Sequence, residues 1–284
     1  MPEDFFSGVD QLEADIAGVR GKTPTFYRDA RCFTLMLPAR LIALRRLLPD
    51  PRFVPAQVLP GIGAVQLTAF EYYDTDIDPY NEFSVSVLLN SRDFLQIPGY
   101  NALRQLVQNC FCAYIHHLPV TTEAALEGGI QLYNYPKFMA SIDFSDTEEW
   151  VTCELAVGGD LICRTKGRKI PAPRNGTMKY TCHLYQYQQP QYAEMKVNAR
   201  SYGMAMGQGN AELEVGTAHP VARELSSMLI SEKPLVYIYV PSMQAILYGP
   251  EHISFAQVAF FLEQGFGFSL SDLADLTKSK KKKE

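Results

Sequence analysis

The sequence lacks the features that would mark a membrane, secreted or nucleic-acid-binding protein. No stretch of its 284 residues approaches the roughly 20 uninterrupted apolar residues that a transmembrane helix needs. The formal net charge is −5, so bulk electrostatics argue against nucleic acid as a partner. The acidic N-terminus shows no signal peptide. These absences predict a cytoplasmic protein that binds neither membrane nor nucleic acid.

Tryptophan and paired cysteines are also scarce. The chain has one Trp beside 16 Tyr and 16 Phe, a composition that favours strands over long helices. Its six cysteines form no C-x-x-C motif, so a structural zinc site is not expected and reduced thiols are the default. Hydrophobic residues make up 47% and charged residues 20% of the chain, which is enough to build a sizeable core.

Hydrophobic periodicity predicts a strand-rich chain without a βαβ rhythm, an internal repeat or a linker. Expected helices cover residues 9–19, 41–48, 101–117, 121–127, 221–230, 254–262 and 270–276. Expected strands cover residues 31–37, 56–74, 82–89, 150–157, 161–164, 179–187 and 235–240, and the strand at 82–89 is expected to be half-buried. The pattern predicts one α+β domain over residues 1–276, mainly antiparallel, built on a barrel-like sheet with peripheral helices. The lysine run at 277–284 is expected to be a disordered tail.

His116 and His117 close the helix expected over residues 101–117. A helix dipole favours partial positive charge at this end. Adjacent side chains on a helix diverge, so the two imidazoles are not expected to share a metal. They are interpreted as capping or surface residues.

The most unusual stretch runs from Gly128 to Ala140 and reads GGIQLYNYPKFMA. The glycine pair is expected to end the preceding helix, and an aromatic, strand-like segment follows it. Lys137 then stands between a proline and apolar residues, and lysine is almost never fully buried without a reason. Enclosure by Tyr135, Phe138 and Met139 would disfavour its charge and leave a neutral amine, which attacks carbonyl carbon to form a Schiff base. The alternative is a lysine on the wet face of an edge strand.

Three segments carry a resemblance to a known family. Gly128 to Lys137 resembles the Gly-Arg-Glu-x-x-x-(Phe/Tyr)-Pro-Lys signature of the acetoacetate decarboxylase family, in which the lysine forms a Schiff base with a keto acid. Residues 78–82, DPYNE, resemble a Pro-Tyr-x-Glu segment whose glutamate lines the active site. Residues 26–29, FYRD, resemble the segment that supplies the active-site arginine, with Arg31 as an alternative to Arg28.

The resemblance implies a closed, cone-shaped β-barrel in a homo-oligomer that acts on a small keto acid. Lys137 would form the imine, Arg28 would seat the carboxylate, and Glu82 would move protons. Tyr135, Phe138, Met139 and Gln131 would contact the substrate. No metal or organic cofactor is implied, because the lysine supplies the electron sink.

The match departs from the family pattern at two places. Phe138 stands where the family's decarboxylases carry a second lysine, and Ile130 and Gln131 replace the signature's arginine and glutamate. Three functions therefore stay open. The chain is a Schiff-base decarboxylase of a β-keto acid such as acetoacetate, a Schiff-base aldolase or dehydratase of a 2-keto acid, or a non-catalytic barrel that binds a small ligand.

Overall fold

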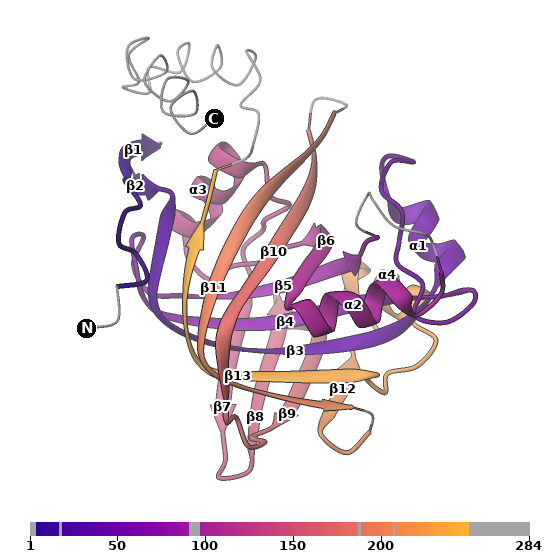
Figure 1. Ribbon diagram of the computed structural model, residues 1–284. Helices are drawn as coiled ribbons and strands as arrows, with labels where there is room; N and C mark the ends of the chain where they lie inside the picture. The colour runs from indigo at the N-terminus through magenta and orange to yellow at the C-terminus, as the bar shows by residue number, and fades with distance from the viewer. Residues whose placement is uncertain (1–3, 17–18, 91–96, 187–188, 207, 250–284) are drawn as a thin grey trace.

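A computed structural model describes residues 4–16, 19–90, 97–186, 189–206 and 208–249. Seven strands form a closed barrel (Figure 1). In spatial order they are β10 (Arg174–Gln186), β11 (Gln189–Met206), β13 (Val236–Leu247), β3 (Thr25–Arg40), β4 (Ile62–Thr75), β5 (Tyr80–Leu88) and β6 (Cys110–His117). Neighbours pair antiparallel except β6 and β10, whose parallel pairing closes the barrel. The predicted α+β class and barrel are confirmed.

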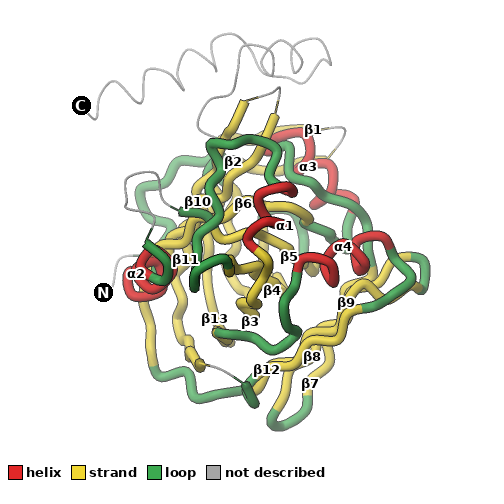
Figure 2. Tube along the Cα trace, turned by 90° about the vertical axis from the view of Figure 1, so that its right-hand side faces the viewer, coloured by secondary structure: helices red, strands yellow, loops and turns green. Residues whose placement is uncertain are grey.

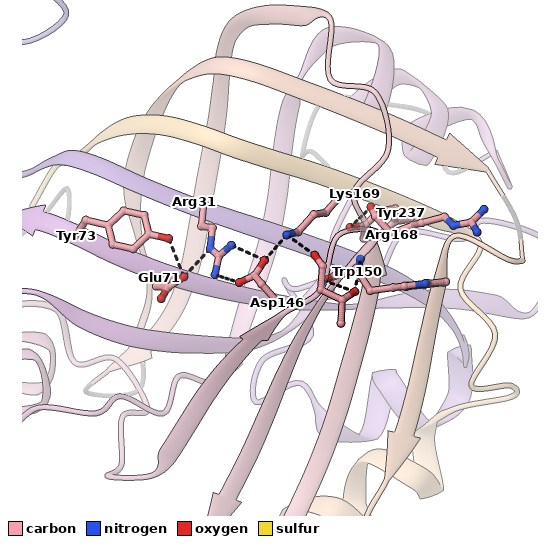
Figure 3. A network of polar contacts seen from close by, with 9 residues as sticks. Arg31, Glu71, Tyr73, Asp146, Trp150, Arg168, Lys169 and Tyr237 are labelled. Atoms are coloured by element: carbon pink, nitrogen blue, oxygen red, sulfur yellow. Dashed lines mark hydrogen bonds and ion pairs between the residues drawn. The ribbon is translucent and has the colours of Figure 1, made fainter.

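A second sheet packs against the outside of the barrel (Figure 2). Its four antiparallel strands, in spatial order, are β12 (Ala211–Val215), β9 (Asp160–Arg168), β8 (Trp150–Val157) and β7 (Ser141–Asp146). Polar contacts join the two layers, because Arg31 on β3 pairs with Glu71 on β4 at 2.5 Å and with Asp146 on β7 at 2.6 Å (Figure 3). Lys169 reaches the same Asp146 at 2.7 Å.

The two faces of β5 show how the barrel is filled. Phe83, Val85 and Val87 belong to the apolar layer between the barrel and the second sheet. The alternate residues, Tyr80 among them, point to the barrel interior. Ser84 on this interior face is only 6% exposed, so the prediction of a half-buried strand is wrong. Because the sheet closes into a barrel, the face of β5 that carries the serines lies inside the barrel and not in solvent.

Four helices and a hairpin surround the barrel within the described residues. The helices are α1 (Leu41–Leu47), α2 (Tyr100–Gln108), α3 (Glu123–Tyr133) and α4 (Pro220–Met228). The hairpin consists of β1 (Leu12–Ile16) and β2 (Val19–Thr23), and it lies with α3 at one end of the barrel (Figures 1 and 2). None of the described helices has the length and apolar character needed to cross a membrane.

Several predicted elements are corrected by the structure. In place of the helix expected over residues 9–19, the described residues form strand β1 over Leu12–Ile16, which pairs with β2 in a hairpin. The helix expected over 101–117 ends at Gln108, where Asn109 adopts a left-handed conformation with φ of 52° and β6 begins. The helix expected to stop before Gly128 instead continues to Tyr133. The helices predicted at 254–262 and 270–276 and the tail at 277–284 lie outside the described residues.

Candidate active site

Lys137 enters the barrel mouth from an extended segment that follows α3. Asn134 ends the helix in a left-handed conformation with φ of 53°. Residues 136–140 then run beside residues 118–120, where Leu118 N–H donates to the carbonyl of Pro136 and Val120 N–H donates to that of Phe138. The prediction of an aromatic, strand-like segment before Lys137 is therefore wrong up to Tyr133, where the chain is still helical. Lys137 itself lies on extended backbone.

The Lys137 side chain is buried and paired with a carboxylate. Its Nζ donates to Oε2 of Glu82 at 2.8 Å, and only 5% of the lysine side chain and 9% of the glutamate side chain are exposed. Tyr72 donates its hydroxyl to the other oxygen of Glu82 at 3.3 Å. The interpretation of Lys137 as a solvent-exposed residue of an edge strand is excluded by this burial.

Glu82 reaches the lysine because it lies on the interior face of β5. Its register partner on β4 is Phe70, and the next pair along the ladder toward this end of the barrel is Glu71 with Asn81, followed by Tyr72 with Tyr80. Period-two alternation therefore directs Glu82, Tyr72 and Tyr80 to the same enclosed side. The Nζ of Lys137 lies 5.6 Å from the ring centroid of Tyr80, within the range of a cation–π contact.

Tyrosines surround the buried pair. Tyr27 and Tyr80 share a hydrogen bond of 3.3 Å between their hydroxyls, and the ring of Tyr72 packs 4.5 Å from that of Tyr27. Burial, reinforced by the Glu82 carboxylate, raises the pKa of Tyr27, Tyr72 and Tyr80 well above the usual value. These hydroxyls consequently stay protonated at neutral pH and act as donors rather than as anions.

A cavity of about 40 Å³ adjoins the amine. It offers space for about three water molecules. Its wall includes Tyr80 from the barrel, Gly129 and Tyr133 from α3, Tyr135, and Lys22 from the β1–β2 hairpin. Lys22 was not singled out by the sequence, since no local pattern around it differs from that of an exposed lysine.

The glycine pair of α3 is explained by this cavity. A Cβ built on Gly129 would lie 3.0 Å from Nζ of Lys137 and closer still to its Cδ and Cε. A Cβ on Gly128 would meet nothing within 4 Å. Gly129 is thus the position at which the helix backbone allows the lysine stem to pass, and any larger residue there must displace the amine.

Both arginines considered as carboxylate anchors lie away from the cavity wall. Arg28 pairs with Asp76 at 2.6 Å and with Asp74 at 3.8 Å, and its side chain is 37% exposed. Arg31 is held in the network between the barrel and the second sheet (Figure 3). Each guanidinium already has carboxylate partners, so neither is placed to receive a ligand beside Lys137.

Of the four residues expected to contact the substrate, Tyr135 lines the cavity. Phe138 packs on the opposite side, 6.1 Å from the ring of His117, because successive residues of extended backbone point in opposite directions. Met139 is 40% exposed. Gln131 donates to Glu127 one helical turn earlier at 2.7 Å. Phe138, Met139 and Gln131 are therefore not part of the cavity wall.

A closed barrel with a buried amine and carboxylate at its mouth defines the class of site. The sequence profile described as Acetoacetate decarboxylase (ADC) matches residues 16–247. The chain therefore belongs to the acetoacetate decarboxylase family, a Schiff-base type of enzyme family, as the three motif segments predicted. No protein with a curated description matches the sequence.

Solved structures share the fold at low sequence identity. The acetoacetate decarboxylase from Legionella pneumophila is 14% identical, with a TM-score of 0.55 over 81% of this chain and 87% of that one. The enduracididine biosynthesis enzyme MppR, complexed with pyruvate, is 11% identical, with a TM-score of 0.54 over 89% and 95%. An acetoacetate decarboxylase-like enzyme from Sphingomonas wittichii RW1 is 16% identical, with a TM-score of 0.50 over 87% and 94%.

Proposed function

We propose that the chain is a Schiff-base-forming lyase that decarboxylates a short β-keto acid such as acetoacetate through an imine on Lys137. The observation that carries the proposal is the buried Lys137–Glu82 pair, whose 2.8 Å contact opens onto a cavity walled by tyrosines. Family membership supports the same chemistry. The small volume of the cavity favours a short keto acid over a bulky one.

Glu82 prepares the nucleophile and completes imine formation. It takes a proton from the Lys137 ammonium, and the free amine attacks the keto carbon of the substrate. Glu82 then returns that proton as the carbinolamine expels water, which leaves a protonated imine and restores the carboxylate. The step consumes no other proton, because the ammonium provides the charge that the iminium carries.

The iminium then acts as the electron sink for decarboxylation. The bond between the α-carbon and the carboxylate breaks, its electron pair enters the iminium, and carbon dioxide leaves a neutral enamine. A proton from solvent, delivered by way of Glu82, is added to the enamine carbon, and hydrolysis releases the ketone and the lysine. Tyr72 holds Glu82 in place throughout through its 3.3 Å hydrogen bond.

Lys22 takes the place of the arginine that was expected to seat the carboxylate. It belongs to the cavity wall, and the ion pairs of the described residues do not include it. A cation at this position attracts an anionic substrate toward Lys137. We assign Arg28 a structural role in its pairs with Asp74 and Asp76.

A second candidate is a Schiff-base aldolase or dehydratase that acts on a 2-keto acid. It uses the same imine but removes an α-proton instead of carbon dioxide, a step that Glu82 is also placed to catalyse. Two observations support this second candidate. Phe138 stands in place of the family's second lysine, and the structurally similar MppR is complexed with pyruvate.

Borohydride trapping tests the proposal. The protein is incubated with acetoacetate or with pyruvate, reduced, and mapped by peptide mass spectrometry, with Lys137→Ala as the control. We expect an adduct on Lys137 and its loss in the variant, and carbon dioxide release from acetoacetate separates the decarboxylase from the aldolase. A stable adduct on Lys22 alone, or no adduct with either acid at saturating concentration, contradicts the assignment and favours the non-catalytic binding barrel.

A further inference from the structure

A cluster of two imidazoles and one carboxylate lies outside the barrel mouth. His116 and His117 end β6, and Glu224 lies on α4. Nε2 of His116 is 3.0 Å and Nε2 of His117 is 2.8 Å from the same oxygen, Oε2 of Glu224. One ligand atom from each residue lies within 4.8 Å of the other two.

The two histidines face the same way because β6 is irregular at this point. On β5, Val85 is paired with His117 while the next residue, Ser86, is paired with Ile115, so His116 is an extra residue in the ladder. Such a bulge interrupts the alternation of side chains. The imidazole ring centroids are consequently only 4.1 Å apart, which overturns the interpretation of the pair as diverging residues at a helix end.

We propose that His116, His117 and Glu224 form a binding site for a divalent first-row transition metal such as Zn²⁺. Two imidazoles and a carboxylate match the three protein ligands of zinc sites that leave a fourth position for water. The exposed fractions of the three side chains are 15%, 20% and 37%, so solvent reaches the cluster and a metal can enter.

Both imidazoles already present their Nε2 atoms to the carboxylate oxygen that would complete the ligand set. A metal bound by both Nε2 atoms would replace these two hydrogen bonds, and each ring would then carry its proton on Nδ1.

A bound metal would join the barrel to α4. His117 contacts the ring of Phe138, which immediately follows Lys137, and α4 packs against β9, β12 and α1. The metal would thus tie the outer wall behind the lysine segment to a helix that is far away in sequence. We expect it to stabilise this packing independently of any catalytic activity.

Calorimetry with Zn²⁺ alone tests the site. Tag-free, chelator-treated protein is titrated with Zn²⁺, compared with Glu224→Gln and His117→Asn, and checked for folding by circular dichroism. His219→Ser is the matched control, since it removes an imidazole at the start of the same helix while serine keeps the N-cap that His219 provides to Val221. Two different ligand variants are used so that the test survives misfolding of one of them.

We expect one Zn²⁺ per chain for the wild type and for His219→Ser, with a rise in Tm on addition of the metal. Affinity is expected to fall at least about 100-fold in both ligand variants, more than the loss of an outer-shell partner causes. Co²⁺ in place of Zn²⁺ should give visible absorption bands that the ligand variants lack. Absence of Zn²⁺ binding by the wild type, or equal affinity in wild type and both folded ligand variants, overturns the proposal.

Discussion

The glycine pair in α3 allows the position of Lys137 to be tested with two nearly identical variants. Gly128→Ala and Gly129→Ala each add one methyl group to adjacent positions of the same helix. Each replaces glycine by the best helix former, which alone is worth about 1 kcal/mol of stability. The difference between the variants therefore comes from what the new methyl group contacts.

At Gly128 the methyl group meets nothing within 4 Å, and at Gly129 it overlaps the stem of Lys137. We expect Gly128→Ala to be more stable than the wild type by about 1 kcal/mol. In Gly129→Ala the stem of Lys137 must shift to make room for the methyl group, which offsets this gain. We therefore expect Gly129→Ala to be less stable than Gly128→Ala by about 1 kcal/mol or more, measured by urea unfolding.

Imine formation gives the second readout for the same pair. A displacement of about 1 Å at a reacting group can cost about 100-fold in rate. We expect the rate of borohydride trapping on Lys137 to fall about 100-fold in Gly129→Ala and to be unchanged in Gly128→Ala. Trapping at the wild-type rate in Gly129→Ala, together with stability equal to that of Gly128→Ala, would refute the placement of the lysine stem against the helix.

Four further predictions concern the site and the core. Glu82→Gln leaves the Lys137 ammonium buried without a base, so trapping should slow by about 10²–10⁴-fold and unfolding should be easier by about 3–5 kcal/mol. Lys22→Gln should raise KM for an anionic keto acid but leave trapping of an uncharged ketone unchanged, and an equal effect on both would remove Lys22 from carboxylate binding. A thiol reagent at pH 8 should label the exposed Cys110. It should spare Cys32, Cys163 and Cys182, because burial raises the pKa of each of these thiols to about 12. The three buried thiols keep their protons at a pH at which the same thiols of the unfolded chain lose theirs. Their contribution to the free energy of unfolding should therefore be fully present below about pH 8.5 and should fall as the pH rises toward 12, as urea unfolding across that range would show.

The motifs singled out Lys137 and Glu82, which the structure brings within 2.8 Å of each other, although the local structure predicted around them was partly wrong. Glu82 was predicted at the start of a strand and in a motif whose glutamate lines the active site, and the alternation of β5 directs its side chain to the enclosed face of the barrel. The glycine pair was misjudged, because glycine usually ends a helix. Here Gly129 lies within α3, and the Lys137 side chain passes so close to it that a residue with a Cβ would overlap that side chain. That contact joins segments separated by a turn and an extended stretch, so no local periodicity reveals it.

Two further features, the end of the helix predicted over residues 101–117 and the position of Lys22, escaped the sequence for related reasons. Apolar residues between 101 and 117 fit helical spacing, but Asn109 turns the chain and the second half pairs with β5 and β10 as β6. Lys22 acquires its position only when the β1–β2 hairpin folds over the barrel end. Partners distant in sequence decide these features, and periodicity within one segment carries no information about them.

The loss of the family's second lysine has a limited electrostatic effect in this backbone. Lys137 and Phe138 follow each other on extended chain, so their side chains leave it in opposite directions. Lys137 meets Glu82 inside the barrel, whereas Phe138 meets His117 and the apolar layer under the second sheet. A cation at position 138 would consequently face that layer rather than the reacting amine. In the proposed mechanism the amine of Lys137 is instead prepared by proton transfer to a carboxylate 2.8 Å away, within a shell of tyrosines that burial keeps neutral. The proposed imine therefore does not depend on a second lysine, and the reaction that we propose depends on which keto acid the cavity admits and on where Glu82 returns the proton.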